Sequence, residues 1–331
     1  MKALRTYLTK SGIIKLRDDL DFILDRLVRK EVGPDIYQQL YGLEQRVSRL
    51  MSQLWQSKTE KAAKLVLGYL QQYGKELNTL QAQAIAQGLN VVMGKELVTA
   101  VKDTKLIDHI HYAYDMAGNA TATKLQLPYA LTFVDQKAKD WLAKDTTYWM
   151  GNFYNQFIKD AVTATVTEYA INQGQPYSVV GQKIKEVIAG NFPIPPKYLP
   201  GSYIRAEGYF SGLASNAVTR ATIFGRIEPM VAAEVETYEI LNAGDARVCP
   251  LCRHMNGKTF SISHAVDMRD KYLAATTPDD IKNIGQWRTL KEVKDWDVAQ
   301  LAASGMSIPP FHFMCRCDIV VSTFAEYVIP A

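Results

Sequence analysis

The distribution of cysteines is the feature that most constrains this chain. Four cysteines lie in two short groups near the C-terminal end, Cys249-Pro250-Leu251-Cys252 and Cys315-Arg316-Cys317, and the sequence before the first group contains none. His312 stands just before the second group. Thiolates two or three positions apart suit a tight metal-binding turn, because both sulfurs can point at one tetrahedral ion. A second group far along the chain would complete the ligand shell and close the segment between them.

Sulfur and imidazole ligands favour zinc over Mg²⁺ or Ca²⁺. Five candidate ligands exist for four positions. Four sulfurs would leave the histidine as a hydrogen-bond donor beside the site, whereas three sulfurs plus the histidine would leave one cysteine outside it. The pattern slightly favours the four-cysteine set. The predicted metal ligands are therefore drawn from Cys249, Cys252, His312, Cys315 and Cys317, and no catalytic residue is predicted.

Two other interpretations of the cysteines remain open, a disulfide or redox pair and ordinary buried thiols. A disulfide framework is typical of small secreted chains, and the basic start of this sequence, Met1 to Leu8, lacks the apolar core of a signal peptide. We therefore expect reduced thiols. A redox Cys-x-x-Cys is expected between a strand and a helix, but Asp245 before the first pair and Asn256-Gly257 after it predict a turn.

Composition excludes some functions. The formal net charge of +4 is weak for 331 residues, which argues against the dense basic surface of a dedicated nucleic-acid-binding protein. No stretch reaches the roughly 18 uninterrupted apolar residues that a membrane-spanning helix requires. The sequence therefore predicts a globular chain without a membrane span.

Apolar residues at helical spacing dominate the first two thirds of the chain. Residues 115–132, with small side chains and a proline, are the predicted linker, and the proline-rich residues 191–202 are a predicted loop. The predicted helices cover residues 13–32, 35–56, 59–73, 76–101, 135–172, 179–189 and 203–226.

Strand patterns appear only near the cysteines. Residues 234–242 alternate polar and apolar side chains, and residues 257–262 and 318–322 are predicted as further strands. The first cysteine group would then lie on a hairpin, and residues 264–307 would contain short helical fragments.

The predicted fold class is α+β, a mainly helical N-terminal part followed by a small α/β C-terminal domain with a zinc-knuckle hairpin. Residues 1–130 are predicted as a helical region. Residues 131–331 are predicted as a second domain, with helices over 135–226 and a metal-braced part over 234–322.

The residues around the cysteines resemble a known family. The sequence runs Asp245-Ala246-Arg247-Val248-Cys249-Pro250-Leu251-Cys252, then Asn256-Gly257-Lys258-Thr259-Phe260, then Pro309-Pro310-Phe311-His312-Phe313-Met314-Cys315-Arg316-Cys317. This is similar to the C-terminal domain of phage minor head proteins of the Mu F-like head morphogenesis family. The family usually has Pro-Asn where this chain has Phe313-Met314, and a Glu is missing from its helix motif at Arg220-Ala221-Thr222-Ile223. The likeness covers about residues 135–322.

The resemblance implies a structural virion protein, present in a few copies per phage head and made in the host cytoplasm. It implies the portal protein and the major capsid protein as partners, with packaged DNA as a further one, and a role in head assembly or DNA delivery. The N-terminal helices are expected to contact the portal or other copies of the chain.

Two further functions compete with this expectation. The family domain is considered similar to the ADP-ribosyltransferase fold, for which Arg220 with Glu236 or Glu239 would be the candidate catalytic pair. A zinc-braced DNA-binding module is the other alternative. His109 and His111 alternate and could bind a metal from one face of a strand, although a surface or hydrogen-bonded pair is the more ordinary interpretation. We expect a protein that is not an enzyme.

Overall fold

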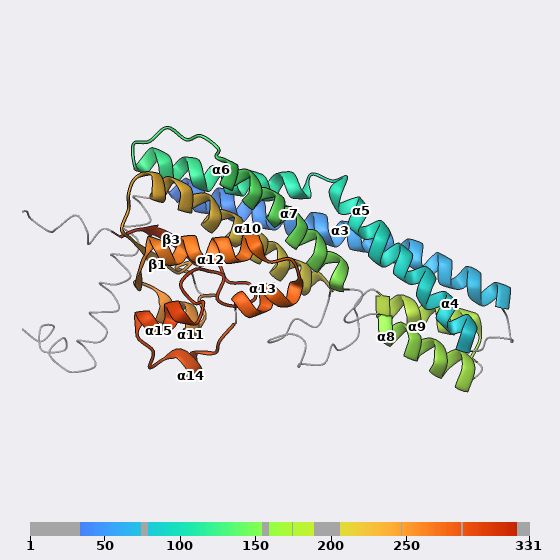
Figure 1. The fold of residues 1–331 in the computed structure, drawn as a ribbon. Helices are drawn as coiled ribbons and strands as arrows, with labels where there is room; N and C mark the ends of the chain where they lie inside the picture. Colours follow the sequence, from blue (N-terminus) through green and yellow to red (C-terminus); the bar gives the residue numbers. More distant parts are fainter. Residues whose placement is uncertain are drawn as a thin grey trace, which may run out of the picture. The chain divides into compact units, whose positions relative to one another are not determined.

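The computed structural model of the chain is mostly helical, with one small antiparallel sheet near the C-terminal end (Figure 1). This confirms the predicted α+β class. The structure describes residues 34–73, 79–153, 159–173, 175–188, 206–245, 247–285 and 287–322. The predicted helix over 13–32 and the predicted loop over 191–202 lie outside these residues.

The helices before the sheet largely follow the apolar spacing. Residues 35–56 and 59–73 form one continuous helix rather than two, and the helix predicted to end at residue 226 continues to Ala232, because Ile227 and Met230 bury their side chains. In order, the elements are α3 (Pro34–Tyr73), α4 (Thr79–Asn90), the π-helical η2 (Val91–Glu96), α5 (Leu97–Lys102), α6 (Leu106–Lys124), α7 (Phe133–Phe153), α8 (Lys159–Thr165), η4 (Val166–Asn172), α9 (Tyr177–Ile188) and α10 (Ala206–Ala232).

The predicted linker over 115–132 is wrong in its first half, because α6 continues to Lys124. The small residues there are packing positions. Gly118 of α6 faces Gly225 of α10, and a Cβ atom on Gly118 would stand 2.9 Å from the carbonyl oxygen of Gly225. Pro229, four residues after Gly225, has no N–H to offer that carbonyl. The freed carbonyl therefore approaches α6 where only glycine leaves room.

Replacing Gly225 by alanine is expected to destabilise the fold by about 2 kcal/mol, since overpacking typically costs 1–3 kcal/mol. A Cβ there would overlap the carbonyl oxygen of Tyr114, so the two helix backbones would have to separate. Urea unfolding measures the change. Gly68→Ala in α3 is the matched control, because nothing lies within 4 Å of its Cβ position and the higher helix propensity of alanine should leave stability unchanged or higher. An unchanged midpoint for Gly225→Ala would contradict this close helix contact.

The C-terminal part is a three-stranded sheet with short helices. The strand order is β2-β1-β3, both pairings are antiparallel, and Tyr238 of β1 stands opposite Phe260 of β2 and Val321 of β3. The elements are β1 (Thr237–Leu241), α11 (Pro250–Met255), β2 (Thr259–Ser261), α12 (Ile262–Ala274), α13 (Pro278–Ile284), α14 (Leu290–Val293), α15 (Val298–Ala303) and β3 (Asp318–Val321). The three predicted strands and the predicted helical fragments over 264–307 are confirmed, with shorter strands.

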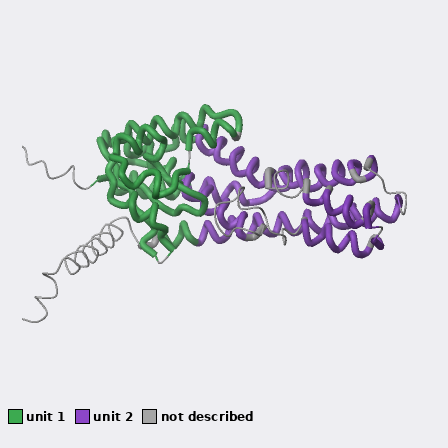
Figure 2. Tube along the Cα trace, turned by 90° about the horizontal axis from the view of Figure 1, so that it is seen from below, with its two compact units in different colours: residues 1–41, 114–135, 222–331 green, residues 42–113, 136–221 purple. Residues whose placement is uncertain are grey.

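The chain forms two compact units, each built from separated stretches of sequence (Figure 2). Unit 1 contains the described residues of 1–41, 114–135 and 222–331, and unit 2 contains those of 42–113 and 136–221. These units do not follow the predicted division at residue 130, which stays a prediction.

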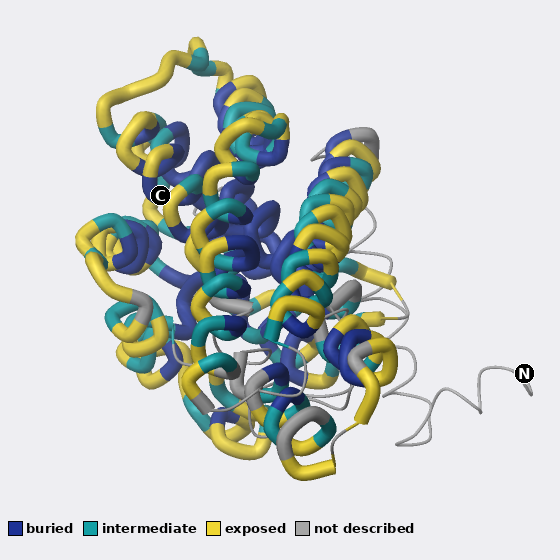
Figure 3. The backbone as a smooth tube through the Cα atoms, turned by 90° about the vertical axis from the view of Figure 1, so that its right-hand side faces the viewer, coloured by how far each residue is buried: buried dark blue, intermediate teal, exposed yellow. Residues whose placement is uncertain are grey.

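Within unit 1, the sheet is held by large buried side chains. Tyr238 is fully buried, its ring stacks on Phe260 with centroids 5.9 Å apart, and its hydroxyl donates a hydrogen bond to the carbonyl oxygen of Ser307. Buried and exposed positions alternate around the long helices of the chain, as Figure 3 shows. The sheet and its short helices place both cysteine groups in unit 1.

Candidate metal centre

The first cysteine group opens a helix. Cys249 is the N-cap of α11, its sulfur accepts a hydrogen bond from the backbone N–H of Cys252 at 3.3 Å, and Pro250 occupies the first turn. A turn precedes it, with Val248 N–H donating to the carbonyl of Asp245, so the predicted turn is confirmed there. The pair itself nevertheless lies between β1 and a helix. The local context therefore does not exclude a redox pair, contrary to the prediction, and the side chains that surround these sulfurs must distinguish a redox pair from a metal site.

The second group is shaped by a tight turn. The N–H of Cys315 donates to the carbonyl oxygen of His312 at 3.1 Å, and Met314 inside the turn has a left-handed backbone with φ of 66°. Asparagine adopts this conformation more readily than methionine does. Cys315 and Cys317 are both buried, with exposures of 0% and 3%.

The structure brings the two groups together. His312 Nε2 lies 3.2 Å from the sulfur of Cys249 and 3.0 Å from that of Cys252. The sulfur of Cys252 lies 3.8 Å from that of Cys315. The five predicted ligands thus form two overlapping clusters, Cys249–Cys252–His312 and Cys252–Cys315–Cys317, each with its ligand atoms within 4.8 Å of one another. Cys252 belongs to both, and the arrangement is close enough to hold a metal ion.

The histidine ring is oriented by its own backbone. His312 Nδ1 lies 2.6 Å from the carbonyl oxygen of Phe313. A carbonyl only accepts hydrogen bonds, so Nδ1 donates to it, while Nε2 faces the sulfurs. Metal-binding histidines are fixed in this way, with one ring nitrogen on a backbone carbonyl and the other on the ion.

The buried thiols share their negative charge unequally. Burial alone raises the pKa of Cys315, but hydrogen bonds from Cys252 and Cys317 outweigh it and lower that pKa well below its usual value. Hydrogen bonding to Cys315 raises the pKa of Cys252, and hydrogen bonding to Cys252 and then Cys315 raises that of Cys317. Without a metal ion, the cluster therefore favours a single thiolate, at Cys315. A bound cation would favour several thiolates.

An ion pair ties the two groups together outside the sulfur cluster. Arg316, between the two last cysteines, reaches both carboxylate oxygens of Asp245, at 2.9 Å and 2.8 Å. The Arg316 hydrogen bond is the main reason that the pKa of Asp245 falls to about 2. Both residues belong to the sequence motif, but their pairing was not predicted. The position of the charged Arg316 between two cysteines was the only sign in the sequence that it has a partner.

A second ion pair, also missed from the sequence, holds the strand that follows Cys317. Asp318 is buried, and its two oxygens accept hydrogen bonds from Arg226 of α10 at 2.8 Å and 2.7 Å. Arg226 also donates to Thr121 of α6 at 3.0 Å. The end of the cysteine group is thereby fixed to two helices of unit 1.

The histidine pair His109 and His111 lies on α6 and not on a strand, which removes the strand geometry of the metal alternative and agrees with the favoured interpretation of a surface or hydrogen-bonded pair. His111 Nε2 forms a hydrogen bond with the carbonyl of Lys139 at 3.0 Å, and burial lowers the pKa of His109. Neither residue belongs to a potential metal-binding cluster among the described residues.

The candidate transferase residues have other surroundings. Arg220 is buried in unit 2, donates to Asp145 at 2.8 Å, and lies over the ring of Trp141 at 5.6 Å from its centroid. Glu236 and Glu239 belong to unit 1, where Glu236 is exposed and Glu239 is half-buried in β1. The charge of Arg220 is thus paired with that of Asp145 inside unit 2.

Comparisons with protein-family models, with curated proteins and with solved structures gave no match. In the part of the chain that the structure describes, no helix has both the length and the apolar character needed to cross a membrane.

Proposed function

We propose that the cysteine cluster holds a structural zinc ion. All the donors are sulfur or imidazole, which zinc prefers. Two thiolates on a tetrahedral zinc with bonds of about 2.3 Å lie about 3.8 Å apart, and the sulfurs of Cys252 and Cys315 have this separation. The contacts of His312 Nε2 with two sulfurs are a few tenths of an ångström shorter than a shared ion requires, and the five donors form two overlapping groups of three, so the side chains would have to rearrange around a single ion.

For the ligand set we propose Cys249, Cys252, His312 and Cys315. The orientation of His312 supports its inclusion, in place of the four-cysteine set that the sequence slightly favoured. Cys317 then stays a buried thiol beside the ion. Four protein ligands leave no position for a water molecule, so the ion would brace the hairpin against the second cysteine group and would have no catalytic role.

We propose further that the chain is a minor head protein of a tailed phage, located inside the head beside the portal. The main support for this proposal is that the residues on which the family resemblance rests lie together in the structure. Both cysteine groups converge, and Asp245 pairs with Arg316 from the other end of the motif. The portal protein and the major capsid protein are the proposed partners, with packaged DNA as a further one. The transferase alternative gains no comparable support from the described residues, because Arg220 is paired with Asp145.

Association with phage particles tests this function. We expect the chain to co-purify with phage heads from lysates of the cells that produce it. Quantitative peptide mass spectrometry should find a few copies per particle, and the chain should stay bound to the heads after nuclease treatment. A soluble host enzyme is the control for trapped cytoplasm. If the chain is abundant in the lysate but absent from particles and portal rings, the head assignment is wrong, while the zinc site would be unaffected.

A further inference from the structure

The loop between α6 and α7, together with the first two residues of α7, presents apolar side chains to solvent. Residues 125–134 carry no charge, and Leu131 and Phe133 are 50% and 84% exposed. Phe133 is the most exposed large apolar side chain among the described residues. Such a concentration on one short segment is typical of a contact surface.

This loop is held in place by hydrogen bonds. Thr132 caps α7, with its N–H and hydroxyl donating to the carboxylate of Asp135 at 2.6 Å and 2.7 Å. The other oxygen of Asp135 accepts from the buried hydroxyl of Tyr114 at 2.5 Å. Tyr129 donates to Asp115 of α6 at 3.4 Å. Because the backbone around Phe133 is held by these bonds, binding through this segment would cost little backbone conformational freedom.

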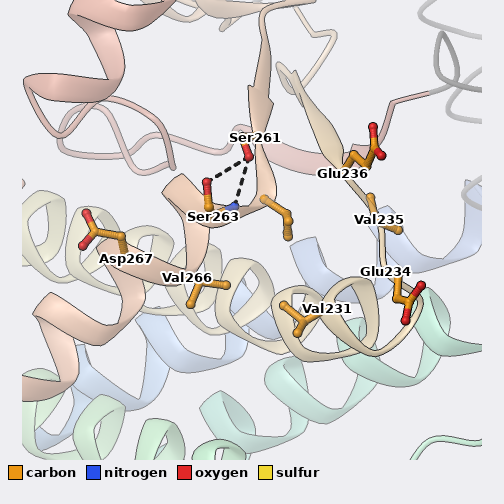
Figure 4. Close-up of a pocket in the computed structure, with 9 residues that line it drawn as sticks. Val231, Glu234, Val235, Glu236, Ser261, Ser263, Val266 and Asp267 are labelled. Atoms are coloured by element: carbon orange, nitrogen blue, oxygen red, sulfur yellow. Dashed lines mark hydrogen bonds between the residues drawn. The ribbon is translucent and has the colours of Figure 1, made fainter.

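An open hollow of about 600 Å³ lies elsewhere on unit 1, where α10 ends and α12 begins. Its apolar lining includes Val231, Val235 and Val266. Figure 4 shows Glu234 and Glu236 on one side of the hollow and Asp267 on the other. Val231 is 42% exposed. The hollow thus combines an apolar base with acidic side chains at its edge, of which Asp267 is paired with Lys271 at 2.7 Å.

The loop and the hollow each combine exposed apolar side chains with charge, and the charges are of opposite sign. Phe133 offers an exposed aromatic ring to the apolar base of the hollow, and Lys124, exposed at the start of the loop, is opposite in charge to Glu234 and Glu236 at its edge. We propose that the loop of one copy of the chain binds the hollow of a second copy, with Phe133 against Val231. This self-association goes beyond the proposed function and does not depend on the zinc ion.

Two surface variants test the contact in the full-length chain. Phe133→Glu and Val231→Glu each place a charge in an apolar contact, and both positions are exposed, so folding should be unchanged by circular dichroism. Sedimentation across a wide concentration range is expected to show self-association of the wild type, weakened about tenfold to a hundredfold in each variant. Tyr112→Glu, at a half-exposed aromatic outside both surfaces, should associate like the wild type.

Mixing the two variants gives the sharpest result. The Phe133→Glu chain keeps an intact hollow and the Val231→Glu chain keeps an intact loop, so an equal mixture is expected to recover complexes that neither variant forms alone. A monomeric wild type at every concentration would overturn the proposal. Association that survives both substitutions, or a mixture that recovers none, would show that loop and hollow do not bind each other.

Discussion

A chain with serine in place of Cys252 is expected to bind no zinc and to lose the folded structure around the sheet. Cys252 is the one residue shared by both ligand clusters, and its sulfur lies within 4 Å of His312 Nε2 and of the sulfur of Cys315. A hydroxyl is a poor zinc ligand, and a structural site contributes its binding energy to folding, about 10–16 kcal/mol in zinc-finger peptides. Zinc per chain by elemental analysis, and amide exchange of β1 and β3, measure the two effects.

The neighbouring variant Arg253→Ser is the matched control, since it introduces the same residue on the same helix at an exposed position. It should keep one zinc ion and wild-type exchange protection. Single variants of the other ligands then define the shell. Cys317→Ser should retain zinc, whereas His312→Ala should lose most of it. Loss of zinc in Cys317→Ser with retention in His312→Ala would establish the four-cysteine set instead. A Cys252→Ser chain that retains a full zinc ion would exclude the site.

The sequence was sufficient to predict that the cysteine groups and His312 come together, because the pattern that they form is local. Two short groups of cysteine, one with a histidine beside it, can be recognised without knowing the fold. The strands around them alternate in a simple way, so the hairpin that carries Cys249 and Cys252 was predicted with its approximate boundaries. The rotation of the His312 ring could not be predicted, since it depends on the turn that places Phe313 O beside Nδ1.

Features that depend on distant contacts were missed. Gly118 and its small neighbours were interpreted as a linker, because the sequence does not reveal that Gly225 of α10 packs against them. The pairing of Arg226 with Asp318 joins residues 92 positions apart. A lone arginine in an apolar helix pattern carries no signal for its partner, so the partner becomes known only from the structure.

Removing the guanidinium of Arg226 is expected to have the second large effect. In Arg226→Met, the carboxylate of Asp318 would stay buried without its counter-charge, and breaking a buried ion pair in this way costs about 3–5 kcal/mol. Burial is the largest single influence and would lower the pKa of Arg226, but the charge of Asp318, the charge of Tyr37 and the hydrogen bond to Asp318 together raise that pKa. Urea unfolding of the zinc-loaded chain measures the loss. Because Asp318 follows Cys317 directly, zinc affinity should fall as well.

The double variant Arg226→Met/Asp318→Leu separates the charge effect from lost packing. With both charges replaced by apolar side chains, no uncompensated carboxylate remains, and most of the lost stability should return. Lys271→Met is the control for ion pairs in general. Its partner Asp267 is 57% exposed and Lys271 itself 55%, so the change should stay below about 1 kcal/mol. If Arg226→Met is no more destabilising than Lys271→Met, then Arg226 does not anchor β3.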